Sequence, residues 1–141
     1  MPRGRPGKSE LEVLKVLWDL GRGTVREVHG VLTGSGREWA YTTVLTLLRR
    51  LAAKGLVESE KGGLAHVFRP AVSREDLLGR RLEDLSDELC DGQAAPLVRA
   101  LIDRRGLERR DVEELRALLD ELEASGPADA PGDRARGKET R

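Results

Sequence analysis

Residues Tyr41 to Gly55, YTTVLTLLRRLAAKG, combine short hydroxyls and guanidinium groups on one predicted helix that Gly55 ends. On a helical wheel the apolar face carries Val44, Leu47, Leu48 and Leu51, and the opposite face carries Thr42, Thr46, Arg49 and Ala53, with Thr43 and Arg50 on its flank. Short threonines let a backbone approach DNA closely, their hydroxyls bond phosphates or base edges, and arginines neutralise phosphates. The pattern therefore predicts a helix that lies in a DNA major groove, with Arg50 and Lys54 extending the contact along the backbone.

An alternative interpretation of the same helix requires no ligand. Thr42 would only cap the helix, and the two arginines would be solvated. The elements on either side favour the DNA interpretation, because they have the order of a DNA-binding domain.

Two helices are predicted before residues 40–54 and a hairpin after them. Ser9 is a candidate cap for the first helix, and Thr24 with Glu27 matches a capping box for the second. Residues 33–38 form a glycine-rich turn, and residues 56–60 and 64–69 are strand candidates around a Lys-Gly-Gly turn. Residues 9–72 thus predict a winged helix-turn-helix DNA-binding domain.

The second half predicts three helices, over residues 73–89, 95–105 and 109–124. Their leucines make thin apolar stripes without an obvious partner in the same chain, which favours a homodimer over packing against the first domain. The predicted dimerisation residues are Leu78, Leu82, Leu85, Leu97, Leu101, Leu115, Leu119 and Leu122. The fold class is mainly α with a small β-hairpin: the winged domain, a helical dimerisation region over 73–124, a flexible basic arm over 1–8 and a disordered tail over 125–141.

Charge is distributed unevenly along the 141 residues. Residues 1–72 carry 12 Lys and Arg against 7 Asp and Glu, and residues 73–141 carry 13 against 18, so the net charge is zero. The asymmetry favours a basic half that faces nucleic acid, although ordinary scatter of surface charges is the alternative.

The few cysteines and histidines argue against metal and redox chemistry. With one cysteine, Cys90, and two histidines, His29 and His66, we expect no disulfide, no metal site and no cofactor. Cys90 fits a small buried hydrophobe near a helix end better than a redox group. We expect neither a membrane span nor a signal peptide, and therefore a cytoplasmic protein.

Three runs of the sequence carry a resemblance to a known family: ELEVLKVLWDLGRGTVREVHGVL, WAYTTVLTLLRRLAAKGLVESEKGGLAHVFRPAVSRED and LCDGQAAPLVRALIDRRGLERRDVEELRALLDEL. Together, over residues 9–124, they resemble the penicillinase repressor family. The resemblance implies a bacterial winged-helix repressor that binds palindromic double-stranded operator DNA as a homodimer. Such repressors typically control β-lactamase, penicillin-binding-protein or transport genes.

Carried over position by position, the resemblance implies that Thr42, Thr43, Thr46 and Arg50 contact DNA. It adds Lys54 as a further phosphate contact and Lys61 at the tip of the wing. Where many relatives have an arginine after the wing glycine, this chain has Leu64, which weakens the expectation of a wing grip on the minor groove.

The inducing signal and any upstream sensor are not readable from the sequence. The Asn-Phe bond at which some relatives are cleaved corresponds to Ala100-Leu101 here, which puts that release mechanism in doubt. Copper sensing through a C-terminal cysteine cluster is excluded by the single cysteine.

Two other functions compete with the repressor. A winged-helix module could bind a protein through the same helix, but hydroxyls and arginines on that face argue against this. An enzyme has no support, because acidic pairs such as Asp87-Glu88 lie in charge-rich helix segments and neither histidine has a nucleophile partner.

Overall fold

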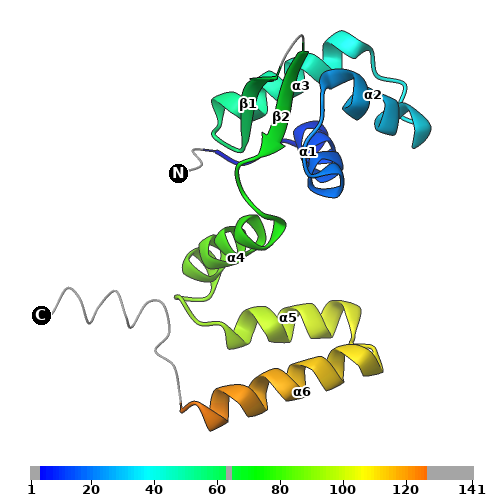
Figure 1. Ribbon diagram of the computed structural model, residues 1–141. Helices are drawn as coiled ribbons and strands as arrows, with labels where there is room; N and C mark the ends of the chain where they lie inside the picture. Colours follow the sequence, from blue (N-terminus) through cyan, green and yellow to red (C-terminus); the bar gives the residue numbers. More distant parts are fainter. Residues whose placement is uncertain (1–3, 63–64, 127–141) are drawn as a thin grey trace, which may run out of the picture. The chain divides into compact units, whose positions relative to one another are not determined.

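The computed structural model describes residues 4–62 and 65–126. Their elements are helices α1 (Lys8–Leu20), α2 (Val25–Gly34) and α3 (Tyr41–Ala53), strands β1 (Val57–Gly62) and β2 (Ala65–Pro70), and helices α4 (Arg74–Leu89), α5 (Ala95–Arg105) and α6 (Arg109–Ala124) (Figure 1). The predicted fold class, mainly α with one hairpin, is confirmed. The chain divides into two compact units, Met1–Leu78 and Gly79–Arg141.

Helices α1, α2 and α3 pack around one apolar core in the first unit. Each presents its aliphatic side chains at helical spacing, and the most deeply buried are Val13, Leu14, Leu17, Val28, Val44, Leu48 and Leu51. The capping box predicted at Thr24 and Glu27 opens α2, because each side chain bonds the backbone N–H of the other residue. Gly55 follows α3 with a φ of +79°, a conformation that glycine adopts without strain.

The hairpin is tied to the helices by backbone bonds as well as by packing. β1 pairs antiparallel with β2, from Val57 opposite Pro70 to Gly62 opposite Ala65. Gly23 and Phe68 exchange two backbone hydrogen bonds of 2.9 and 2.8 Å, which join β2 to the segment just before α2. Phe68 is buried in the core. Because an isolated hairpin is only marginally stable, this bridge and the Phe68 anchor fix the wing in place.

The start of the chain differs from the expectation of a flexible arm over residues 1–8. α1 begins at Lys8 rather than after Ser9, and Gly7 is its N-cap residue. Pro6 is buried, so the segment from Gly4 to Gly7 has a defined path along the domain. Residues 1–3 lie outside the described part of the chain.

The first unit extends beyond the predicted boundary at residue 72. Val72 and Leu77 belong to its core. The indole N–H of Trp18 donates to the Val72 carbonyl at 2.9 Å, and the Arg74 guanidinium lies 4.9 Å from the centre of the Trp18 ring. The first turn of α4 is therefore part of the winged domain, and Ser73 caps it through a bond from the Asp76 N–H, as its capping-box pattern indicates.

The second unit has almost no interior of its own. Among the described residues 79–126, Ser86 is the one buried residue, and it donates its hydroxyl to the Gln93 carbonyl in the turn after α4. Cys90, beside this turn, is half-buried and not in a disulfide. Of the tail predicted for 125–141, only Ser125 and Gly126 are described. No helix in the described residues is long and apolar enough to cross a membrane.

Candidate nucleic-acid interface

The face of α3 opposite the core is polar and open to solvent. The side chains of Thr42, Thr43, Thr46, Arg49 and Arg50 are all exposed, whereas the aliphatic face is buried. The Thr46 hydroxyl donates to the Thr42 carbonyl one turn earlier and keeps its lone pairs free to accept. Neither arginine forms an ion pair with another described residue.

The turn before α3 is braced from α2. His29 Nε2 lies 2.8 Å from the Trp39 carbonyl oxygen, and the His29 ring meets the Tyr41 ring edge-on at 6.0 Å. Trp39 is half-buried against the core, and Arg37 covers its ring while pairing with Glu12 of α1. These contacts hold the N-terminal end of α3 in place, which a helix that reads DNA requires.

An open groove of about 970 Å³ runs beside the exposed face of α3. Its walls come from the start of α2, from α3 and from the wing, and the Gly23–Phe68 bridge sets their separation. The polar lining residues are Thr24, Arg26, Tyr41, Arg49, Ser59 and His66. Arg26 is exposed and, like Arg49, is in no ion pair with another described residue. The groove is thus positively charged at two of its walls.

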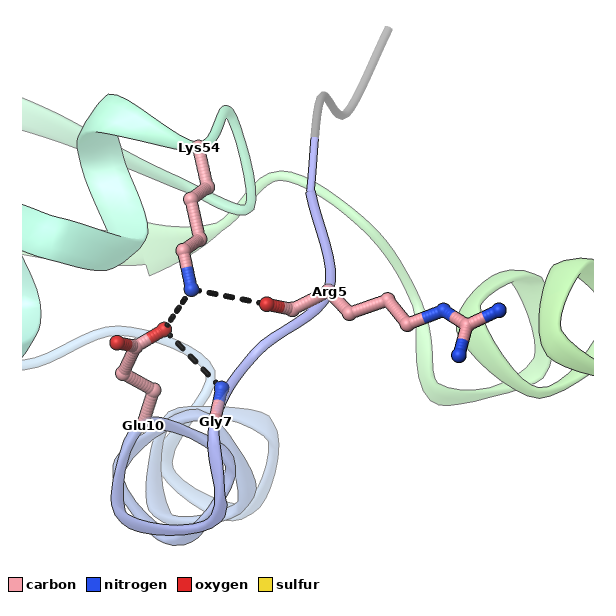
Figure 2. A network of polar contacts seen from close by, with 4 residues as sticks. All are labelled: Arg5, Gly7, Glu10 and Lys54. Atoms are coloured by element: carbon pink, nitrogen blue, oxygen red, sulfur yellow. Dashed lines mark hydrogen bonds and ion pairs between the residues drawn. The ribbon is translucent and has the colours of Figure 1, made fainter.

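Lys54, by contrast, directs its charge into the protein. Figure 2 shows its ammonium between Glu10 of α1 and the backbone of Arg5. The Nζ atom lies 2.6 Å from Glu10 Oε1 and donates to the Arg5 carbonyl at 2.9 Å. The same Glu10 oxygen accepts from the Gly7 N–H at 3.2 Å, and Glu10 is only 7% exposed.

Glu10 stays ionised because of this network. Burial alone would raise the pKa of its carboxyl group, but the Lys54 and Gly7 hydrogen bonds and the charges of Lys54 and Arg50 outweigh burial and lower the pKa from its usual 4.5. Breaking a buried ion pair costs about 3–5 kcal/mol, compared with about 0–1 kcal/mol for an exposed one. Since Lys54 is one-third exposed, we place this pair between those limits.

This pKa shift predicts acid destabilisation through Glu10. A carboxyl group whose pKa is lower in the folded state stabilises the fold above the unfolded-state pKa and loses that contribution as pH falls through the folded-state value. As the pH is lowered below about 4.5, we expect the melting temperature of the wild type to decrease. The melting temperature of Glu10→Gln should decrease less steeply over the same range. Thermal unfolding followed by circular dichroism from pH 7 to 3 measures this. Glu38→Gln, at an exposed carboxylate, should follow the wild type; equal slopes for all three proteins would contradict the prediction.

The predicted contact residues do not all lie on this exposed surface. Thr42, Thr43, Thr46 and Arg50 lie together on exposed α3, but Lys54 is held by Glu10. Lys61 lies in β1 opposite His66, and its side chain is outside the described part, as is Leu64. Arg26, Ser59 and His66 were not among the predicted contacts, and Arg49 was only placed on the polar face. Arg26 could have been found from its position in the first turn of α2.

Comparison with known proteins gives consistent matches along the chain. The family model described as penicillinase repressor matches residues 6–121. The Transcriptional regulator BlaI of Mycobacterium tuberculosis is 36% identical over 122 residues, which are 85% of this chain and 86% of that protein. An uncharacterised 16.5 kDa protein of Latilactobacillus sakei is 30% identical over 84% of this chain and 81% of its own length. A solution structure of the DNA binding domain of the repressor BlaI matches 52% of this chain and 92% of its own, with 32% identity and a TM-score of 0.47.

Proposed function

The chain belongs to the penicillinase repressor family, and we propose that it is a homodimeric transcriptional repressor that binds palindromic operator DNA. The observation that carries the proposal is the exposed face of α3, which presents three threonines and two arginines that form no ion pair with another described residue. One of these arginines, Arg49, also lines the groove that the wing helps to form. A DNA duplex offers the phosphates that such a surface binds, and its major groove admits a helix of this kind.

The proposed contacts fall into two classes. Thr42, Thr43 and Thr46 lie toward the N-terminal half of α3 and would approach base edges, where their hydroxyls and methyl groups discriminate between bases. The guanidinium groups would bind phosphates: Arg50 on α3, as the sequence predicts, and Arg49 and Arg26 at the groove. Arg26 and Arg49 lie on two walls of one groove, so a single backbone strand could contact both.

The proposed dimer rests on Leu78 and on the leucines of the second unit. Seven of the eight predicted dimerisation leucines are exposed, from 36% at Leu115 to 58% at Leu101 and Leu119, and Leu97 is half-buried. α5 and α6 bury no residue. Helices with an apolar stripe need a partner surface, and a second copy of the same stripe supplies one with closed symmetry. Two copies would place two α3 helices on the two halves of a palindrome.

A protein-interaction module without DNA binding is the competing function. It would use an exposed apolar patch on α3, whereas the exposed positions there carry hydroxyls and guanidinium groups. The test is a fluorescence-anisotropy titration of the purified protein against DNA from its own upstream promoter and a scrambled control, at several salt concentrations. Genes for β-lactam resistance near the coding sequence are the first targets to examine.

We expect tight, salt-sensitive binding to the promoter DNA at two chains per site, and weaker binding to the scrambled DNA. Binding to neither DNA would favour the interaction module. Equal binding to both would leave a DNA-binding protein whose operator lies elsewhere.

Two substitutions on α3 separate phosphate contact from base reading. Arg50→Ala should weaken binding to promoter and scrambled DNA alike, by about 10-fold for each chain of the dimer, and flatten the salt dependence, because it removes a charge from each chain. Thr46→Val keeps the shape but removes the hydroxyl, so it should impair promoter binding selectively. The same titration measures both variants. Wild-type binding by both would remove this face of α3 from the interface.

A further inference from the structure

The sequence position of Lys54 predicts a phosphate contact, but its side chain bonds other residues of the protein. It follows Arg50 by one turn at the end of α3, yet its Nζ atom meets the Glu10 carboxylate and the Arg5 carbonyl (Figure 2). We propose that Lys54 is a positioning residue that fastens the segment from Gly4 to Gly7 and the start of α1 to the end of α3, and that it binds no phosphate. The second half of this statement rests on the proposed function.

The buried carboxylate of Glu10 holds the lysine in place. Glu10 is 7% exposed, and its Oε1 atom accepts from both the Lys54 ammonium and the Gly7 N–H. Moving Lys54 to a phosphate would leave a buried anion with one backbone bond and the more distant charge of Arg50. An unpaired buried charge is much less stable than an exposed one. A phosphate contact of Lys54 would therefore contribute less free energy than the loss of its pair with Glu10 would cost.

The lysine stem adds packing to these polar bonds. A Cβ placed on Gly4 would lie 3.5 Å from both Cγ and Cδ of Lys54, so the backbone at Gly4 runs within contact distance of the aliphatic stem. Pro6, between this contact and the Gly7 cap, is buried. The stem, the ammonium and the carboxylate thus contact Gly4, Arg5 and Gly7 of the N-terminal segment, respectively.

This arrangement also defines which cations of α3 face the ligand. Arg49 and Arg50 are exposed and in no ion pair with another described residue, whereas the charge of Lys54 is neutralised by Glu10 at 2.6 Å. The phosphate contacts of α3 therefore end at Arg50. The edge of the helix beyond it is occupied by the protein's own N-terminal segment.

The first test uses the salt dependence of DNA binding by the full chain. The variant Glu10→Gln/Lys54→Met removes both charges of the pair, so no buried charge is left alone. We expect its slope of log K against log salt to equal that of the wild type, while Arg50→Ala lowers the slope by about 1.8 for the two chains of a dimer. A fall of about 1.8 in the double variant would mean that Lys54 binds a phosphate, and would overturn that half of the proposal.

A second test needs no variant of the pair. Amine-reactive labelling of the wild-type protein, read by mass spectrometry, should modify Lys54 much more slowly than exposed Lys15, and DNA should leave the Lys54 rate unchanged. Fast labelling of Lys54 that DNA suppresses would contradict the proposal. If the wild type binds no DNA, the repressor function fails, and the labelling rate in the free protein still tests the internal pair.

The anchoring itself is tested by the motion of the N-terminal segment. Heteronuclear NOE values of the Gly4, Arg5 and Gly7 amides should be those of a rigid backbone in the wild type, fall in Lys54→Met and recover in Lys54→Arg. Unchanged values in Lys54→Met would show that Lys54 does not hold the segment.

Discussion

A chain that ends at Leu78 should be monomeric and bind the full palindrome about 100-fold or more weakly than the full-length protein. The winged domain would be intact, because Val72 and Leu77 remain in its core and Trp18 keeps its bond to Val72. The truncation removes every predicted dimerisation leucine except Leu78, and with them the second binding event that a dimer makes intramolecular. Analytical ultracentrifugation and anisotropy titration on full-site and half-site DNA measure the two effects.

Point substitutions in the full chain give the matched comparison. Leu101→Glu and Leu119→Glu place a charge at positions that are each 58% exposed, so they should separate the dimer without unfolding the chain. Val31→Glu, at an exposed apolar position of α2, is the control and should stay dimeric. If 1–78 or both glutamate variants remained dimers, the second unit would have no role in assembly.

The local features of the chain were predictable because their causes lie within a few residues. The two faces of α3 follow from side-chain spacing, and the capping bonds at Thr24–Glu27 and from the Asp76 N–H to Ser73 join residues three apart. The leucine stripes follow from the same periodicity. The positions of the helices and the polarity of their faces can therefore be predicted from the sequence.

The contacts that change the interpretation of the site join residues far apart. Lys54 meets Glu10 across 44 residues, and no periodicity in either helix indicates that pair. The groove depends on the bridge from Gly23 to Phe68, which fixes the wing against the start of α2. Sequence spacing identified the cations of α3, but only packing distinguishes the arginines that face solvent from the lysine that faces a carboxylate.

The second large effect concerns the groove. We expect the variant Arg26→Ala/Arg49→Ala to bind DNA much more weakly than the wild type. Hydrogen bonds to charged groups contribute about 1.5–3 kcal/mol each, so removing two per chain should weaken binding to any DNA by about 100-fold or more for each chain of the dimer at moderate salt. The slope against log salt should fall by about 3.6, because a dimer of this variant lacks both arginines in each of its chains. Both side chains are exposed, and the melting temperature should stay within a few degrees of the wild type.

Arg69→Ala supplies the control on the wing. Its guanidinium already pairs with Glu58 at 3.1 Å and lies 3.7 Å from Glu60, so its removal should change the slope little although the same kind of charge is removed from the same domain. A full effect of the groove variant with none for Arg69→Ala would mean that unpaired cations, rather than the total charge of the winged domain, set DNA affinity. Equal effects would mean that the total charge of the winged domain sets DNA affinity. The groove would then bind no DNA backbone.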